Sequence, residues 1–366
     1  MKILTVGGAM IDTIAVIANE RVERMTMRNA DTSFLLLEEG RKNEAEDIST
    51  HCGGGAVNAA VALARLGHDV ATLIKLGQDA RAETILSRLS EEGVSTRFAL
   101  RDARKPTGAS VLVSAHDRNA AIFTFRGANT LLEATDLKKD AFAADLVYVS
   151  SLSNESADCF PKIVELAKAA GALVATNPGI RQLSARLGQF RDVIGKIDIL
   201  AFNRHEAGAL VPWLIAQSGA GEGGHLLEHR PGEVLPDLAR RGLVAGGFEL
   251  SLAGFFVGLH KLGPRWVVVT DGRDGAYVSA PTGILHCPAP TVTVAGTAGA
   301  GDAFSSTFAA CIAEAAPAED AAIAAAANAS SVLGYIDTQT GLLRQKDLES
   351  RIATLRNSLK ITRWKV

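Results

Sequence analysis

Residues 296–304 read GTAGAGDAF and lead directly into the apolar run SSTFAACIA. The run after Asp302 favours a helix, which places Gly299, Ala300 and Gly301 at its first turn. N–H groups at the start of a helix have no partner within the helix and attract anions. We therefore expect an anion hole for a phosphoryl group, with Asp302 as the base that deprotonates an attacking hydroxyl. The alternative is that Asp302 only caps the helix.

Short apolar runs alternate with helical patterns along most of the chain. Helix candidates at 56–67 and 80–93 each end on a glycine, as helices often do. The runs between such helices are brief and end in Gly, Ser or Asn, which is typical of buried strands; they include 2–8, 69–77, 145–151, 173–179, 197–203 and 265–272. This alternation predicts an α/β fold with a doubly wound, mostly parallel sheet and helices on both faces.

Three segments depart from this alternation. Residues 13–50 and 107–126 each read as antiparallel strands, and we expect them to form a small β-sheet lid. The lid is inserted in a single domain that covers residues 1–366. Residues 211–250 contain SGAGEGG and HRPGE, which predict a surface insertion between two core elements.

Composition limits the classes of partner. The chain has 366 residues, 47% hydrophobic and 21% charged, with a net charge of −2 and no basic block. We expect neither nucleic acid nor a membrane surface as a partner. The chain has no uninterrupted run of 18 apolar residues, so we expect no membrane span. The four widely spaced cysteines indicate reduced thiols, and with a first apolar run too short for a signal peptide they predict a cytoplasmic protein.

Two N-terminal positions suit a polyhydroxylated ligand. In CGGGAVNAAVALARLG, residues 52–67, the glycines allow a ligand close to the backbone, and Asn58 offers both a donor and an acceptor. The alternative is tight packing between helix and sheet, with Asn58 as a cap or exposed to solvent. Asp12 follows the first strand without G-x-G-x-x-G spacing, which disfavours a nicotinamide-dependent oxidoreductase. Asp12 fits an acceptor for sugar hydroxyls, or a simple turn aspartate.

The stretch NRHE, residues 203–206, follows a predicted strand and opens a predicted helix. Its amide and carboxylate stand three residues apart, which would suit a hydrated Mg²⁺. The same spacing is typical of a capping box.

Taken together, these stretches resemble a known family. GGGAVNAAVALARLG (53–67) and GTAGAGDAF (296–304) resemble the two signatures of the ribokinase-like (PfkB) carbohydrate kinases. NRHE resembles the family's N-x-x-E motif, while VVVTDGRDGAYV (267–278) and FRGAN (125–129) resemble its nucleotide and substrate segments. The resemblance spans nearly the whole chain in the correct order. It implies a ribokinase-like fold and ATP-dependent transfer of the γ-phosphoryl group to a primary hydroxyl of a carbohydrate.

The resemblance also implies roles for individual residues. Asp302 matches the catalytic base, and the anion hole is matched by Gly299, Ala300 and Gly301. Positions that match substrate contacts are Asp12, Gly54, Gly55 and Asn58, with Arg126 as a further candidate. Positions that match nucleotide contacts are Asn203, Thr270, Gly272, Gly275 and Asn328, and Glu206 matches the Mg²⁺ region. Mg²⁺ and the anion hole would then offset the charge on the transferring group.

Gly296 departs from the family pattern. The family usually has an Asp at this position, which helps to hold an activating monovalent cation, so we expect a weaker dependence on K⁺ here. Lids in the family often pair, which implies a homodimer through the lid.

Two other functions stay open for the same scaffold. One is a nucleoside (adenosine-like) kinase, and the other is a catalytically inactive sugar-binding protein. Retention of Asp302 and the anion hole disfavours the inactive protein. The sequence does not identify which sugar, sugar acid or nucleoside is the substrate.

Overall fold

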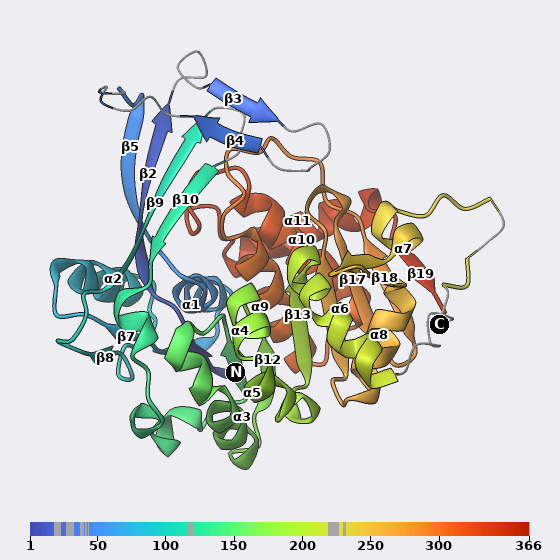
Figure 1. The fold of residues 1–366 in the computed structure, drawn as a ribbon, viewed down its shortest axis with the longest axis horizontal. Coiled ribbons are helices and arrows are strands. Elements are labelled where there is room, and N and C mark those ends of the chain that lie inside the picture. Colours follow the sequence, from blue (N-terminus) through green and yellow to red (C-terminus); the bar gives the residue numbers. More distant parts are fainter. Residues whose placement is uncertain are drawn as a thin grey trace.

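A nine-stranded sheet of described residues crosses the body of the molecule (Figure 1). The computed structural model describes residues 1–17, 23–26, 33–36, 40, 42, 44–115, 120–218, 227–229 and 232–365. The strands of the sheet, in spatial order, are β19 (Thr362–Trp364), β18 (Gly283–Cys287), β17 (Ala276–Ala280), β16 (Trp266–Thr270), β13 (Ile199–Asn203), β12 (Leu173–Thr176), β11 (Leu146–Val149), β1 (Lys2–Val6) and β6 (Asp69–Leu73). Neighbouring strands from β16 to β6 are parallel, and β17, β18 and β19 continue the sheet antiparallel. The predicted doubly wound, mostly parallel sheet is confirmed.

Helices cover both faces of this sheet, which explains why its strands are apolar on both sides. Helices packed on one face are α3 (Phe160–Ala169), α4 (Ile180–Ala185), α5 (Leu187–Arg191), α6 (Arg204–Ser218), α7 (Asp237–Arg241) and α8 (Leu252–Lys261). Helices packed on the other face are α1 (Gly55–Arg65), α2 (Ala80–Glu91), α9 (Ala300–Ala313) and α10 (Ala318–Val332), with α11 (Gln345–Ser358) outside α10. The sheet is therefore buried between two helical layers.

The order of the strands determines where a site can form. β1 lies between β6 and β11, so successive connections leave β1 in opposite directions and open a crevice beyond the carboxyl ends of the strands. Asn203 and Thr270 are the last residues of β13 and β16, and Ser150 follows β11. Polar residues thus gather at one edge of an otherwise apolar sheet.

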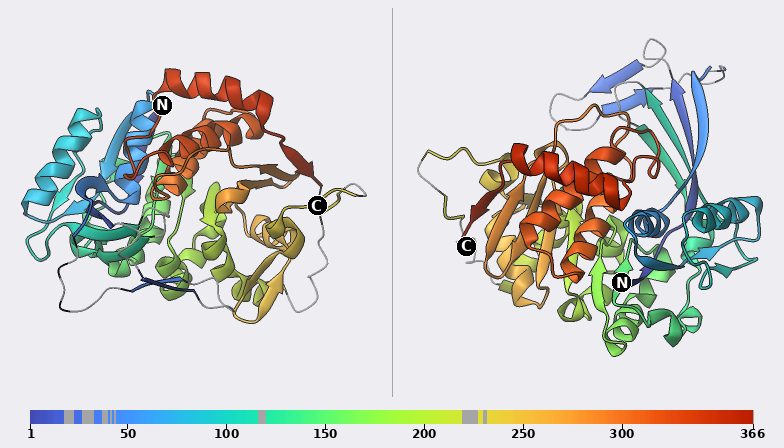
Figure 2. Two further views of the ribbon diagram at one scale, coloured as in Figure 1. Left: turned by 90° about the horizontal axis from the view of Figure 1, so that it is seen from above. Right: turned by 180° about the vertical axis from the view of Figure 1, so that it is seen from behind.

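A second sheet stands out from one side of the body (Figure 2). Its order is β10 (Ala120–Phe125), β9 (Gly108–Ala115), β2 (Met10–Ile17) and β5 (Asp47–Gly53). Each of the two predicted lid segments contributes an antiparallel pair, and the parallel pairing of β2 with β9 joins them. The first segment begins earlier than predicted, at Met10. We call this four-stranded sheet the lid.

Smaller hairpins and pairs complete the β structure. They are β3 (Glu23–Thr26) with β4 (Ser33–Leu36), β7 (Lys75–Leu76) with β8 (Leu100–Arg101), and β14 (Leu243–Ala245) with β15 (Phe248–Leu250). Residues 18–22, 27–32, 37–39, 41, 43 and 116–119 of the predicted lid segments lie outside the described residues.

The prediction of a surface insertion at 211–250 is wrong for much of that segment. α6 continues to Ser218, so the start of the segment is a core helix. Farther along, Leu238, Leu243 and Leu250 are buried in the same core as α6 and α8, because they cover apolar residues of those helices. Residues 219–226, 230 and 231 lie outside the described residues.

Across the described ranges no helix combines the length and the apolar character that a bilayer span requires. All four cysteines are unbridged.

Candidate active site

Asp302 lies in the first turn of α9, but it does not cap the helix. The N-cap residue is Gly299, and Asp302 is the third helical residue. Its Oδ2 accepts a hydrogen bond from Nδ2 of Asn58 on α1, at 2.9 Å. Burial raises the pKa of Asp302; the Asn58 hydrogen bond opposes this shift and the negative charge of Asp12 adds to it. The capping alternative for Asp302 is therefore wrong.

The predicted anion hole depends on a glycine at position 299. Gly299 has a left-handed backbone with φ of 80°, and a Cβ there would lie only 2.7 Å from Cβ of Thr338. This turn leaves the first amides of α9, including those of Ala300 and Gly301, without partners inside the helix. Their position at the positive end of a 14-residue helix suits an anion.

Asp12 lies on the lid, within strand β2 and not in a turn. Its Cα partners across the strands are Ser110 on β9 and His51 on β5. The Ser110 hydroxyl donates a short hydrogen bond to Oδ1 of Asp12. Burial raises the pKa of Asp12, and this hydrogen bond and His51 both lower it. The turn alternative is wrong, and the Asp12 carboxylate belongs to the lid face that also carries Ser110 and His51.

Two glycines let the lid, α1 and the sheet edge approach Asp302. Gly54 has φ of 96°, and a Cβ there would lie 2.5 Å from the carbonyl oxygen of Gly8. A Cβ on Gly55 would lie 2.8 Å from Cβ of Ser150 and 3.3 Å from Oδ1 of Asp302. The absence of side chains at Gly54 and Gly55 therefore brings three elements together. Asn58, which follows them, is 4% exposed and is neither a cap nor solvated.

Arg126 follows β10 at the edge of the lid. Its Nη1 donates to Oγ of Ser153, beyond the end of β11, at 2.9 Å. Burial lowers the pKa of Arg126, and the nearby positive charge of Arg181 lowers it further. None of the carboxylates in the described ranges forms an ion pair with Arg126 or Arg181.

A cavity of about 630 Å³ extends from the end of the sheet to the first turn of α9. Its lining includes four positions predicted to contact a nucleotide: Asn203, Thr270, Gly272 and Gly275. Ala300 and Gly301 line the same cavity, which connects it to the predicted anion hole. Apolar walls come from residues such as Val292, Phe304 and Ala329.

Asn328 is not among the residues that line this cavity. It is fully buried in α10, where its Nδ2 donates to Oγ1 of Thr307 and its Oδ1 accepts from the Leu343 amide, both at 2.9 Å. Its neighbours Ala326 and Ala329 face the cavity. The structure therefore gives the Asn328 side chain packing partners within the protein.

Asn203 and Glu206 form a reciprocal capping box at the start of α6. The Glu206 amide donates to Oδ1 of Asn203, and the Asn203 amide donates to Oε2 of Glu206, both at 2.9 Å. Burial raises the pKa of Glu206 to about 7; the Asn203 backbone opposes this, and the charge of Asp302 adds to it. Glu206 therefore faces the same interior as Asp302, from the other side of the site.

Within the described residues, no cluster of three or more His, Cys, Asp or Glu side chains could hold a metal ion alone. A single carboxylate beside a phosphate site still suits Mg²⁺, which usually takes most of its ligands from water and substrate phosphates. Glu206 fits that limited role.

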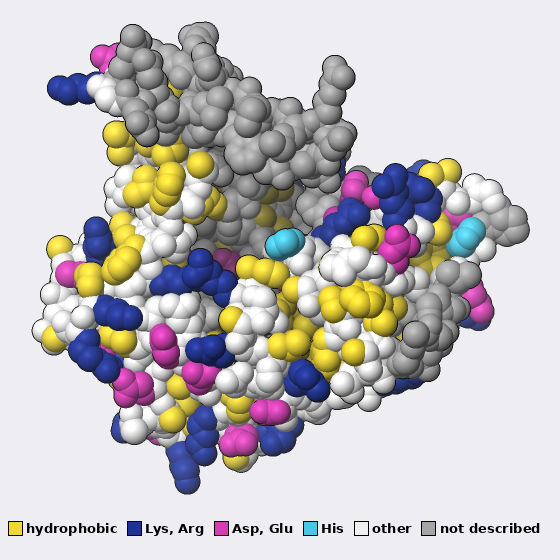
Figure 3. Space-filling view, viewed as in Figure 1, with side chains coloured by type: hydrophobic (Ala, Val, Ile, Leu, Met, Phe, Trp, Pro, Cys, Tyr) yellow, Lys and Arg dark blue, Asp and Glu magenta, His cyan; other side chains and the backbone are white. Residues whose placement is uncertain are grey.

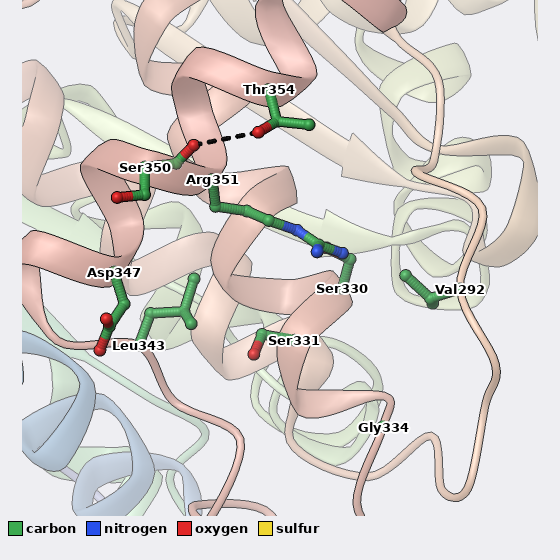
Figure 4. A pocket seen from close by; sticks show the side chains of 9 residues that line it. All are labelled: Val292, Ser330, Ser331, Gly334, Leu343, Asp347, Ser350, Arg351 and Thr354. Carbon is green, nitrogen blue, oxygen red and sulfur yellow. Dashed lines mark hydrogen bonds between the residues drawn. The ribbon is translucent and has the colours of Figure 1, made fainter.

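A further pocket of about 430 Å³ lies between α10, α11 and the loop at Val292 (Figure 4). It shares Val292 and Ser330 with the larger cavity. Arg351 extends from α11 toward Ser330, and Asp347, one helical turn earlier, points away from it (Figure 4). The pocket contains none of the residues predicted for the site.

Sequence reasoning did not find Ser110, His51, Ser150, Thr338 or Gln339. Ser110 and His51 reach Asp12 only through cross-strand pairing, which no local pattern indicates. Thr338 and Gln339 belong to the loop between α10 and α11, far along the chain from their partner Asn58. Ser150 did have a readable signal, because it is a polar residue directly after a buried strand.

The model of the pfkB family carbohydrate kinase matches residues 20–218 and 256–345, and the chain belongs to this family of sugar phosphotransferases. Deoxyribokinase of Salmonella typhi is 28% identical over 305 residues, which cover 81% of this chain and 84% of the relative. Arabidopsis thaliana ribokinase, solved with ribose and ATP, superposes with a TM-score of 0.70 at 21% identity, over 96% of this chain and 98% of that one.

An E. coli chain provisionally labelled ribokinase II, solved with ATP and Mg²⁺, has a TM-score of 0.71 at 17% identity, over 96% of this chain and 99% of that one. These two structural likenesses establish the ribokinase-like fold, which agrees with the fold expected from the sequence.

Proposed function

We propose that the chain is an ATP-dependent sugar kinase that transfers the γ-phosphoryl group to a primary hydroxyl. One observation carries the proposal. The Asp302 carboxylate, hydrogen-bonded to Asn58, lies in the same helical turn as the Ala300 and Gly301 backbone that ends the large cavity. A base and an anion-binding turn thus adjoin at the end of a nucleotide-sized space, which is the arrangement that phosphoryl transfer needs.

The residues of this chain would divide the reaction between them. Asp12 and Asn58 offer an acceptor and a donor to the hydroxyls of the sugar. Asp302 accepts the proton of the attacking hydroxyl, which becomes a better nucleophile as the proton leaves. Amides at the start of α9 face the negative charge of the transferring group. The lid carries Asp12, so we propose that closure of the lid brings this residue to the sugar and excludes water.

The residues present fit ATP and Mg²⁺. Gly272 and Gly275 expose backbone along the cavity, and Phe304 and Val292 give the cavity apolar walls for the adenine ring of ATP. ATP supplies the phosphoryl group, and Mg²⁺ offsets the charge of its phosphates. Glu206 and Asn203 would hold the hydrated metal and the adjoining phosphates.

Within the sugar kinases, Arg126 favours a substrate that carries an acidic group. Its guanidinium is partly buried, its hydrogen-bond partner among the described residues is the neutral Ser153, and it lies near the second cation Arg181. Two guanidinium groups without carboxylate partners are stabilised when an anion binds between them. A sugar acid supplies such an anion, whereas a nucleoside, the alternative substrate, does not.

An ADP-release assay across pentoses, hexoses, sugar acids and nucleosides tests the proposal. We expect ADP release to be fastest with a sugar acid. In Arg126→Gln, kcat/KM for that sugar acid should fall. Equal activity of Arg126→Gln would remove the argument for an acidic substrate. Sugar binding without any ADP release would instead support the inactive sugar-binding alternative.

A further inference from the structure

The side-chain amide of Asn58 is held in one orientation. Its Oδ1 accepts from Oγ1 of Thr338 at 2.8 Å and from Nε2 of Gln339 at 3.2 Å. Nε2 of Gln339 can only donate, so it selects the oxygen end of the amide, and the Thr338 hydroxyl donates to the same oxygen. The nitrogen end is then left to donate to Oδ2 of Asp302 at 2.9 Å. The contacts of the Asn58 oxygen therefore determine that the nitrogen of this amide, and not its oxygen, faces the candidate base Asp302.

Gln339 is itself oriented by a charged group. Its Oε1 accepts from Nε of Arg88 at 3.2 Å, which turns its Nε2 toward Asn58. Nη2 of Arg88 pairs in turn with Oε1 of Glu92 at 2.7 Å. Thr338 has a second acceptor, the Cys52 carbonyl at 3.4 Å, but the contact with Asn58 is shorter. A chain of donors thus runs from α2 to the active site.

The backbone of this loop is held by other contacts. Oδ1 of Asp337 accepts from the amides of Gln339 and Thr340, at 2.8 and 2.7 Å. Nη1 of Arg65 donates to the Gln339 carbonyl at 2.8 Å. Substitution of the Thr338 or Gln339 side chain leaves all three contacts in place.

We propose that Thr338 and Gln339 are positioning residues that orient the Asn58 amide so that it donates to the Asp302 carboxylate. The inference rests on the proposed function for its catalytic meaning, since Asp302 is the base only in a kinase. Its structural content, the orientation of one amide, does not depend on the reaction.

Orientation matters because, among the described residues, Asn58 is the side chain that donates a hydrogen bond to the Asp302 carboxylate. The groups that face Asp302 across the site include the carboxylates of Asp12 on the lid and Glu206 on α6, and Tyr148 on β11. The two carboxylates disfavour a negative charge on Asp302 by repulsion, and the buried Tyr148 offers no compensating charge. A flipped Asn58 would present an oxygen to the carboxylate, so loss of the orienting donors raises the pH at which Asp302 ionises.

The test uses the double variant Thr338→Val, Gln339→Met, which keeps the size of both side chains and removes both donors. ¹³C NMR of labelled aspartate, with the Asp302 signal assigned through Asp302→Asn, follows its titration in the full chain without turnover. We expect a midpoint higher by on the order of 1 pH unit. Thr338→Ser, which keeps a hydroxyl, and Thr340→Val, in the same loop, should titrate like the wild type.

The same shift should appear in the acid limb of the pH profile of kcat. At pH values below this limb, kcat of the double variant should be about tenfold lower than that of the wild type, and above it the two rates should be equal. An unchanged NMR midpoint in the folded double variant overturns the inference. A shifted midpoint in a chain that phosphorylates no sugar would support the positioning role and refute the proposed function, so the two failures are distinct.

Discussion

At the scale of single residues, the site places a carboxylate where its charge is poorly solvated. Asp302 is surrounded by protein, and among the described residues the side chain that hydrogen-bonds its carboxylate is the neutral amide of Asn58. A base in such a position is a stronger proton acceptor, but the folded state loses stability by keeping it ionised. Function and stability therefore oppose each other at this residue.

This opposition predicts that Asp302→Asn raises the melting temperature at neutral pH. Burial raises the folded-state pKa above that of the unfolded chain, so the stabilising effect of the protonated form is present at low pH and lost as pH rises through the folded pKa. Asparagine carries no charge, so the variant avoids that loss. The gain in melting temperature should shrink as the pH is lowered toward about 4.

Asp102→Asn is the matched control for this melting experiment. Hydrogen bonds from Arg104, with Lys75 nearby, hold the pKa of Asp102 well below its usual range. Removing that charge should lower the melting temperature at neutral pH. A lower melting temperature for Asp302→Asn as well would contradict the argument from burial.

Gly296 predicts a weak dependence of activity on K⁺. A Cβ at this position would lie 2.8 Å from the carbonyl oxygen of Tyr335 and 3.2 Å from that of Ile336, so no carboxylate can be added without movement of this loop. Backbone carbonyls alone bind a monovalent cation more weakly than a site with a charged ligand. We expect similar initial rates in Na⁺ and K⁺ buffers of equal ionic strength, and a several-fold increase with K⁺ would refute this.

At the scale of elements, the start of α6 combines a cap with a charge. Glu206→Gln separates the two, because glutamine also completes a capping box. The melting temperature should not fall, since burial raises the pKa of Glu206 to about 7 and glutamine avoids a buried charge. The lost charge should weaken the response to Mg²⁺ by about 10- to 100-fold, as for other residues around a metal. A titration of the rate with Mg²⁺ measures this, with the exposed neighbour variant His205→Gln as control.

An unchanged Mg²⁺ titration in Glu206→Gln would leave Glu206 with only its role in the cap. A lower melting temperature would instead indicate that the capping box requires the charge.

The elements of the central sheet were predictable because their signals are local. Buried strands such as LVYV at β11 are continuously apolar, and glycines mark the ends of helices. The two lid segments were found because they interrupt that pattern. The pairing of Asp12 with Ser110, and of Asn58 with Thr338, was not predictable, since each joins residues about 100 or more positions apart. The prediction of a surface insertion at 211–250 is wrong for much of this segment because its glycines and prolines are typical of loops, and no local pattern marks its three buried leucines.

At the scale of the whole molecule, part of the outer face of the lid is apolar and exposed. By strand alternation, Val111, Phe123 and Phe125 share that face with Ile48, and they are 44, 62, 50 and 66% exposed. Hydrophobic side chains gather over these strands in the space-filling view (Figure 3). Patches of this kind favour association with another surface.

We therefore predict a homodimer that forms through the lid. Light scattering should give twice the 38.3 kDa mass of one chain. Phe123→Lys should give monomers, because a charge placed in an apolar interface is costly to desolvate. Val244→Lys, which changes an exposed apolar residue of β14, should leave the dimer intact. A monomeric wild type at working concentration would refute the prediction.

The account as a whole depends on Asp302 acting as the base in phosphoryl transfer from ATP to a sugar. The most direct test compares kcat and the affinities for sugar and ATP between the wild type and Asp302→Asn, with the melting curves described above. Asparagine keeps the size and most hydrogen bonds of the side chain but cannot take the proton. We predict a folded variant that binds both ligands nearly normally and whose kcat falls on the order of 10²–10⁴-fold. A folded Asp302→Asn with a kcat close to that of the wild type would contradict the account.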